Sequence, residues 1–268
     1  MTFTFIIQFK YDSTDRLKNL LRCLIYLTHQ FKDTAEYLVI LQNNVLENGE
    51  KCSEYLQTIF TEYKLKNVTI HSCELYGPYH RSKIINNGLR LAKNNVCVIY
   101  DCDILLPKEQ IDLSVELCDS KYQLVFPYTN PQYDIPQDYF KDFSYDYDFE
   151  NLQYKIRPRQ LQHNHQTEQY PVIGYATGFS MVVNKNSLGN LVFFNEEFNG
   201  WGYEDSEYIF KMRFFDVKMT RVYGQVFHIE HSRELQDMYK SYTEKNYLLY
   251  LQLKNKNRDE LLDYYKQK

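Results

Sequence analysis

Two aspartates separated by one residue, Asp101 and Asp103, follow directly after the apolar run Val96–Tyr100. Residues i and i+2 of an extended segment point the same way, so the two carboxylates can face one site. Carboxylate oxygens are hard ligands that suit Mg²⁺ or Mn²⁺, and these ions commonly bridge protein carboxylates to phosphate oxygens. Two solvated acids at the end of a strand are the alternative. The position after a buried strand favours a metal site.

Two histidines, His228 and His231, follow the last strand pattern of the chain, Val222–Phe227. Imidazoles at positions i and i+3 can converge on one ion if the backbone turns between them. A structural role is the usual explanation for a lone histidine. For this pair, a metal site and a structural role are about equally supported. A second pair, His163 and His165, lies in a polar region and is expected to be exposed.

The chain has one tryptophan, Trp201, which stands between Gly200 and Gly202 and is followed by Glu204 and Asp205 at the start of a helix pattern. Glycines on both sides let the loop adopt unusual backbone angles. An indole beside carboxylates is typical of a sugar site, because the ring packs on the apolar face of a pyranose while the acids accept hydrogen bonds from its hydroxyls. Alternatively, the indole anchors the core and the helix dipole favours the acids. That alternative explains the acids but not the two glycines.

The elements that must position these residues alternate between strand and helix patterns in the first half of the chain. Continuous β-branched runs between amphipathic helices are typical of parallel strands covered on both faces. In such sheets, ligands bind beyond the carboxyl ends of the strands. The pattern predicts strands at Thr2–Phe9, Tyr37–Leu41, Val68–His71 and Val96–Tyr100, and helices after Asp12, from Cys52 to Tyr63 and over Ser82–Ala92.

Periodicity is weaker in the second half of the chain. After an apolar run at Tyr122–Tyr128, the segment Thr129–Gln169 is rich in tyrosine, proline and acids and shows no sustained period, which is typical of a long loop. The pattern then predicts a strand at Gly178–Val183, a helix over Ser206–Phe215, a strand at Val222–Phe227 and a helical tail from Glu234.

The composition is that of a folded globular chain: of 268 residues, 44% are hydrophobic and 25% are charged, and the formal net charge is −4. This charge argues against a nucleic-acid partner, since nucleic-acid binders usually carry a basic face. No apolar run is long enough to span a bilayer, and the first residues lack the basic start and the cleavage site of a signal peptide. We therefore expect a cytoplasmic protein without a transmembrane segment, whose oligomeric state the sequence does not indicate.

In their order and spacing, these motifs resemble the β-1,4-galactosyltransferase family and its relatives, including the galactosyltransferase C-terminal domain shared with chondroitin-type polymerases. The resemblance runs from Phe5 to Arg233. Five segments carry it: FIIQFKYDSTDRLKNL at the first strand and donor-binding turn, YHRSKIINNG at a helix start, DCDILLP at the metal motif, GWGYEDSE at the acceptor motif, and HIEHSR near its end.

The resemblance implies a single GT-A domain over 1–268, an α/β fold with a Rossmann-like, mixed and mostly parallel central sheet flanked by helices. Residues 1–120 would form the half that binds the nucleotide sugar, 121–233 the half that binds the acceptor, and 234–268 a C-terminal helical tail. The implied activity is that of a glycosyltransferase, a β-1,4-galactosyltransferase-like hexosyltransferase. With Mn²⁺ or Mg²⁺, it would transfer a hexose or N-acetylhexosamine from a UDP-sugar to a glycan hydroxyl, with inversion.

Two other classes of protein compete with this activity as explanations of the sequence. A sugar-1-phosphate nucleotidyltransferase needs a glycine-rich loop after its first strand to hold a triphosphate, and the first glycine of this chain is Gly49. A catalytically inactive module that binds a nucleotide sugar or a glycan stays open as the alternative.

Carried over position by position, the resemblance gives the polar clusters their roles. Asp103 and His231 would ligate the metal, and His228 would do so at a position where the family has a methionine. Asp205 would be the base that deprotonates the attacking hydroxyl, with Glu204 beside it in the catalytic pair.

The resemblance also implies the residues around the two substrates. The donor would lie against Phe9, Lys10, Arg16, Arg81, Asp101 and Trp201, and the acceptor sugar against Trp201, Gly202, Glu204 and Asp205. Trp201 would sit on the loop that closes over the donor, and Tyr203, where the family has a glycine, would stiffen that loop. Tyr175 aligns with a family residue that sets donor preference. The tyrosine-rich segment with Arg157 and Arg159 is a candidate acceptor surface, although an exposed loop is the default for it.

Overall fold

Seven strands form one central sheet, and the apolar runs of the first half supply four adjacent ones. The computed structural model describes residues 2–42, 46, 49–129, 132–140, 143–156, 158, 177–232 and 236–267, with 236–240 as backbone only. In spatial order the strands are β3 (Val68–Cys73), β2 (Ala35–Gln42), β1 (Phe3–Phe9), β4 (Val96–Asp101), β8 (Ser180–Asn184), β6 (Leu124–Phe126) and β9 (Met219–Arg221). Strand β8 is antiparallel to both neighbours, and the other adjacent pairs are parallel. The predicted mixed, mostly parallel sheet is confirmed.

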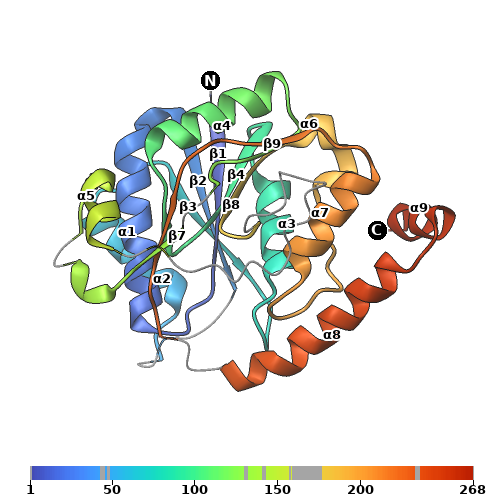
Figure 1. Cartoon of the computed structure of the whole chain (residues 1–268). Helices are drawn as coiled ribbons and strands as arrows, with labels where there is room; N and C mark the ends of the chain where they lie inside the picture. Colours follow the sequence, from blue (N-terminus) through green and yellow to red (C-terminus); the bar gives the residue numbers. More distant parts are fainter. Residues whose placement is uncertain are drawn as a thin grey trace.

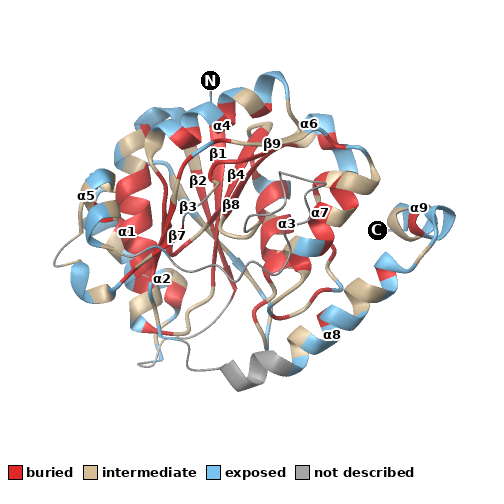
Figure 2. Ribbon diagram, viewed as in Figure 1, coloured by how far each residue is buried: buried red, intermediate tan, exposed pale blue. Residues whose placement is uncertain are grey.

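Helices cover both faces of this sheet (Figure 1). One face carries α1 (Thr14–Phe31), α2 (Cys52–Glu62) and α4 (Lys108–Ser120), and the other carries α3 (Arg81–Leu91), α6 (Lys185–Leu188) and α7 (Glu204–Phe214). Because side chains alternate along a strand, Phe5 and Ile7 pack in the core cluster of α1 while Ile6 packs in that of α3. Figure 2 shows the central strands buried between the two helical layers.

Helix α3 approaches the sheet most closely at Gly88. A Cβ atom at this position would lie 2.3 Å from Cγ2 of Ile6 and 3.1 Å from Cγ1 of Ile40. Both isoleucines are fully buried, so neither side chain has room to move away. The glycine therefore allows α3 to lie directly against β1 and β2.

A second, three-stranded sheet joins distant parts of the chain. Strand β10 (Val226–Ile229) lies between β5 (Ile104–Leu105), to which it is antiparallel, and β7 (Gln132–Ile135), to which it is parallel. The amide of Ile229 donates a hydrogen bond to the carbonyl oxygen of Asp103 over 2.7 Å. This small sheet brings the segment after β4 beside the segment that carries the two histidines.

The remaining elements are η1 (Lys32–Thr34), η2 (Gln137–Tyr139), α5 (Phe149–Lys155), η3 (Gly189–Val192), α8 (Gln236–Lys254) and α9 (Arg258–Lys266). Asn257 and Glu260 form a capping box that starts α9. A small core cluster of Phe198, Leu253 and Leu261 holds the C-terminal helices to the body of the protein. None of the helices in the described part of the chain has the length and apolar content that crossing a bilayer requires.

Two predictions from the sequence pattern were wrong in detail. The strand predicted at Val222–Phe227 begins later than predicted, because β9 ends at Arg221 and β10 begins only at Val226. Between them Gly224 has φ of +151°, and a Cβ there would lie 2.2 Å from Oε1 of Gln110, so the chain turns where the apolar pattern continues. The segment Thr129–Gln169, predicted as a loop, contains β7, η2 and α5 among its described residues.

We predict that Gly88→Ala destabilises the protein. Alanine favours a helix over glycine by about 1 kcal/mol, but the added methyl group overpacks a rigid contact with Ile6, which typically costs about 1–3 kcal/mol. Urea unfolding should show a lower midpoint with an unchanged slope. The control is Leu91→Ala at an exposed position on the same helix, for which we expect a change within about 0.5 kcal/mol. A Gly88→Ala variant as stable as the wild type would contradict the close contact.

Candidate functional site

Arg81 lies among three carboxylates at the carboxyl edge of the sheet. It begins α3, and its side chain is 7% exposed. Its Nη1 lies 2.5 Å from Oδ1 of Asp205 and 3.9 Å from Oε1 of Glu204, and its Nη2 lies 3.2 Å from Oδ1 of Asp101. Asp101 ends β4, while the other two acids begin α7. One cation thus connects the sheet to the first turn of a helix distant in sequence.

Two carboxylates of this cluster, those of Glu204 and Asp101, have pKa values raised above their ordinary range. Burial raises the pKa of Glu204 to about 7, with a further contribution from the charge of Asp205 and an opposing one from Arg81. Burial likewise raises the pKa of Asp101 to about 6, against the attraction of Arg81. Burial disfavours the charged form of Arg81, but the surrounding acids outweigh it and raise its pKa well above the ordinary value. Glu204 and Asp101 therefore have pKa values close to neutral pH.

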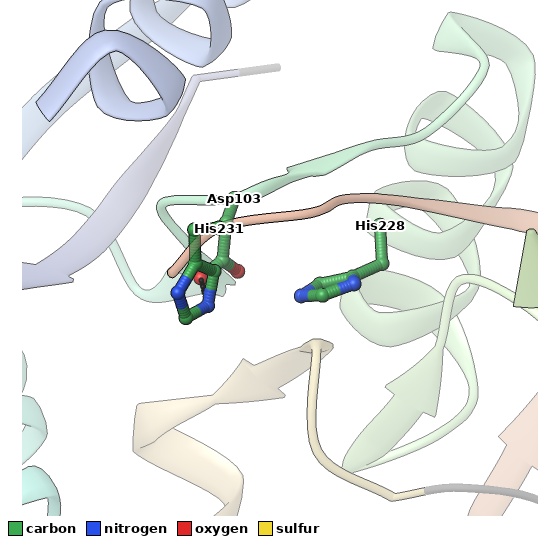
Figure 3. Close-up of side chains that lie close together, drawn as sticks. All are labelled: Asp103, His228 and His231. Atoms are coloured by element: carbon green, nitrogen blue, oxygen red, sulfur yellow. Dashed lines mark ion pairs between the residues drawn. The ribbon is translucent and has the colours of Figure 1, made fainter. Parts of the chain in front are cut away.

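A second cluster consists of Asp103, His228 and His231 (Figure 3). One potential ligand atom from each side chain lies within 4.8 Å of the other two. Nε2 of His231 lies 3.3 Å from Oδ2 of Asp103. Burial opposes ionisation of Asp103, but the hydrogen bond from His231 and the charges of His228 and Arg16 outweigh it and hold the pKa of this aspartate well below its usual range. One carboxylate oxygen and two imidazole nitrogens form a donor set suited to a divalent transition metal.

The expectation that Asp101 and Asp103 face one site was wrong, because the two residues do not belong to the same strand. The strand β4 ends at Asp101, and Cys102 and Asp103 form a turn. Asp101 accepts hydrogen bonds from Gln8 and Arg81, whereas Asp103 faces the histidines. The turn therefore separates the two acids into adjacent clusters.

Asp134 is a site residue that the sequence analysis missed. It lies on β7 in register with His228 on β10, and its Oδ1 is 2.9 Å from Nδ1 of that histidine. A carboxylate that accepts the Nδ1 proton of a histidine leaves Nε2 as the ligand atom and fixes the plane of the ring. No sequence signal marks Asp134, because only the pairing of β7 with β10 brings it to the site.

The predicted donor-binding residues of the first strand and turn lie in different environments. Phe9 is fully buried in the core cluster with α1, so only its backbone borders the edge of the sheet. Lys10 donates a hydrogen bond of 2.7 Å to the carbonyl oxygen of Gly77. Arg16 pairs with Asp12 at 2.9 Å, and its Nε lies 3.7 Å from Oδ2 of Asp103. The structure thus brings Arg16, but not the ring of Phe9, to the candidate metal cluster.

Trp201 lies in a loop over Asn199–Tyr203, hereafter the Trp201 loop. Its side chain is 57% exposed, so the alternative that it anchors the core is wrong. Gly200 forms an isolated parallel bridge with His80, the neighbour of Arg81, and Tyr203 immediately precedes α7. Both ends of the loop are therefore connected through the backbone to the cluster of Arg81 and its three carboxylates: Gly200 pairs with the residue before Arg81, and Tyr203 precedes Glu204.

Room for Asp205 depends on Gly178, another residue without a predicted role. A Cβ atom at Gly178 would lie 3.1 Å from Oδ2 of Asp205. The carbonyl oxygen of Gly178 accepts a hydrogen bond of 3.1 Å from the hydroxyl of Tyr128. Five residues named in the sequence analysis lie outside the described part of the chain: Arg157, Arg159, His163, His165 and Tyr175.

Comparison with known proteins gives one matching family model, over part of the chain, and one fold. The family model described as the N-terminal domain of galactosyltransferase matches residues 157–232, the segment that contains the Trp201 loop, Asp205 and both histidines of the second cluster. No curated protein sequence matches the chain.

Several solved structures are similar to the chain. TarS 1-349 of S. aureus in complex with UDP-GlcNAc has a TM-score of 0.61 at 14% identity, with 99% of this chain and 71% of that chain covered. GalNAc-T7 with UDP, GalNAc and Mn²⁺ has a TM-score of 0.62 at 16% identity, covering 98% of this chain and 50% of that one. The mannosyltransferase PcManGT from Pyrobaculum calidifontis with GDP-Man and Mn²⁺ gives 0.54 at 16% identity, covering 90% and 59%.

The chain spans only part of the length of these proteins. It covers half of GalNAc-T7, and 60% of the chain in a second crystal structure of TarS 1-349. At these identities the likeness establishes the fold. The neighbouring structures are GT-A glycosyltransferases, and this chain therefore has the GT-A glycosyltransferase fold, with a segment that matches the galactosyltransferase family model.

Proposed function

We propose that the chain is a metal-dependent glycosyltransferase that transfers a sugar from a nucleotide donor to a glycan hydroxyl. The observation that carries the proposal is the adjacency of two clusters at the carboxyl edge of the sheet. Asp103 and the two histidines can hold a metal, and two of the acids around Arg81 directly follow the loop that carries the exposed Trp201. In α/β sheets of this kind, ligands bind at this edge.

We infer that the donor is a UDP-hexose or a UDP-N-acetylhexosamine. The matched family model is that of galactosyltransferases. Two of the similar structures contain UDP with GalNAc or UDP-GlcNAc, whereas one contains GDP-Man. We assign residues 1–120 to donor binding, through Lys10, Arg16, Arg81 and the backbone at Phe9, and residues 121–233 to acceptor binding. The helices after 234 support the second half.

We assign Asp103, His228 and His231 as the residues that would hold the metal, and Mn²⁺ as the ion they suit. Two imidazole nitrogens among three ligands favour Mn²⁺ over Mg²⁺, which prefers oxygen ligands and keeps several waters. When bound, the ion would neutralise the charge of the leaving diphosphate. Arg16 lies close enough to Asp103 to add positive charge at the same place.

We assign the chemistry of the acceptor to the start of α7. Oδ1 of Asp205 is held by Arg81, and Gly178 leaves space beside Oδ2. We propose that Oδ2 accepts the proton of the attacking hydroxyl as the new bond forms. Glu204, with one buried carboxylate oxygen that has no hydrogen-bond partner among the described residues, is positioned to bind a second hydroxyl. Trp201 and Gly202 complete the acceptor site.

Attack opposite the leaving group inverts the anomeric centre, and a product that keeps the donor configuration would refute this single displacement.

The first test is the release of nucleoside diphosphate from a panel of UDP- and GDP-sugars with Mn²⁺. We expect slow hydrolysis of one donor, abolished by EDTA and reduced about 100-fold or more by Asp103→Ala, because removing even an indirect metal contact costs 10–100-fold. The matched control is Asp119→Ala on the exposed surface of α4, which should act like the wild type. Donor binding without turnover, even with simple sugars as acceptors, would favour the inactive binding module.

We predict that Asp134→Asn weakens Mn²⁺ binding by about 10–100-fold, because the carboxylate no longer fixes the orientation and tautomer of His228. Isothermal titration of Mn²⁺ into the protein measures this without any substrate. The control is Asp138→Asn, which changes an exposed carboxylate four residues away and should leave the affinity unchanged. Equal affinities in both variants would remove Asp134 from the site.

We predict that Glu204 makes stability depend on pH between about 4.5 and 7. The pKa of Glu204 is raised in the native state to about 7, so the native state binds more protons than the unfolded chain in this window. The free energy of unfolding therefore falls as pH rises through it. Glu204→Gln should remove this dependence. As pH rises from 5 to 8, the free energy of unfolding of this variant should therefore increase by about 1–3 kcal/mol relative to that of the wild type. Urea unfolding at both pH values measures it, with the exposed Glu244→Gln as control; parallel pH dependence of wild type and Glu204→Gln would contradict the raised pKa.

A further inference from the structure

Helix α8 binds the backbone of the Trp201 loop through its side chains, and Figure 1 shows this helix running past the start of α7. Nδ2 of Asn246 donates to the carbonyl oxygen of Asn199 over 3.0 Å and to that of Gly202 over 2.9 Å. Oγ1 of Thr243 donates to the carbonyl oxygen of Trp201 over 3.0 Å. Two residues i and i+3 on one helix face therefore satisfy three carbonyl groups of a five-residue loop.

The two glycines of the loop permit its backbone shape without determining it, and Tyr203 disfavours it. Gly200, Gly202 and Tyr203 have φ of +77°, +102° and +68°, and for the tyrosine this left-handed conformation is unfavourable. A Cβ at Gly200 would lie 2.7 Å from Cβ of Tyr242 on α8, so the helix lies directly on the glycine backbone. Because the local sequence does not determine this conformation, contacts from outside the loop must do so.

The ring of Tyr203 is held by the same helix. Its centroid lies 5.1 Å from that of Tyr247 and 5.7 Å from that of Tyr250. Tyr203 is also the residue before α7, and its side chain makes no capping hydrogen bond to that helix. The start of α7 is therefore positioned by packing on α8 rather than by a local cap.

The position of the Trp201 loop sets the position of the reactive acids. Glu204 and Asp205 are the first two residues of α7, directly after the loop. On the other side, Gly200 pairs with His80, next to Arg81. A shift of the loop backbone would move the indole and both acids relative to the guanidinium.

We propose that Asn246 is a positioning residue for the acceptor site: by donating to the carbonyls of Asn199 and Gly202, it holds Trp201, Glu204 and Asp205 in one arrangement. The side chain is 4% exposed and contacts the loop through a single amide group. The inference rests on the proposed function for its consequence on catalysis. The mechanical part, that α8 orders the loop, stands on the contacts alone.

The chain itself contains the probe for this proposal, because Trp201 is its one tryptophan. Time-resolved fluorescence anisotropy therefore reports the motion of the loop without a label and without any substrate. The first variant is Asn246→Asp, which keeps the size of the side chain and removes its hydrogen-bond donor. The matched control is Asn255→Asp, which adds the same charge at an exposed position just after α8.

We expect Asn246→Asp to increase the fast, local component of the Trp201 anisotropy decay at least twofold, with the control unchanged. In transfer assays, KM for the acceptor should rise about tenfold or more while the affinity for UDP with Mn²⁺ stays within twofold. A second variant, Thr243→Val, removes a hydroxyl that binds the same loop and should change both readouts in the same direction by less. It also tests the proposal if Asn246→Asp does not fold.

Unchanged anisotropy and unchanged acceptor KM in a folded Asn246→Asp protein would overturn the proposal, as would an equal change in the control. A fall in UDP affinity as large as the rise in acceptor KM would also overturn it, because it would show a general structural role. If the wild type transfers no sugar, the proposed function fails, and the anisotropy still decides whether α8 orders the loop.

Discussion

The candidate site depends on one buried cation. Arg81 is almost fully covered by protein, and a guanidinium in that position is costly unless acids compensate it. Asp101 comes from the sheet and Glu204 and Asp205 from α7, so the ion pairs hold a strand and a helix together across more than a hundred residues of sequence. Without the guanidinium the three carboxylates would lose the positive charge that compensates their mutual repulsion, which favours protonation of at least one of them.

The close packing of α3 on the sheet determines where Arg81 lies. Gly88 lets the helix lie directly on Ile6 and Ile40, which places Arg81, nearly two turns earlier, over the carboxyl ends of the strands. The ring of Tyr79 lies beneath the guanidinium of Arg16, whose carbon atom is 5.4 Å from the ring centre. Two arginines from different helices thus lie at the same edge of the sheet. Arg81 lies among the three carboxylates, and Arg16 lies beside Asp103 of the candidate metal cluster.

The sequence predicted the elements whose signals are local. Periodic apolar residues identified the first four strands, α1, α2, α3 and α7, and polar residues after strands identified Asp101, Asp103, His228 and His231 as candidates. The roles of Asp134 and Asn246 could not be predicted, because each arises from a contact between elements that have no sequence relation: β7 with β10, and α8 with the Trp201 loop. The turn at Cys102, which separates the two aspartates, was also missed, since a period of two continues through it in the sequence.

The place of β8 in the sheet has a consequence for the order in which the chain folds during synthesis. Strands β1 to β4 come from the first 101 residues and can pair among themselves as they leave the ribosome. Strand β6 pairs with β8 and β9 but not with β4, so it has no sheet to join until residues 180–184 arrive. The histidines and α8 emerge later still. The nascent chain can therefore assemble β1 to β4 first, and the two clusters that the proposed reaction needs are completed only after residues 204–231 have been synthesised.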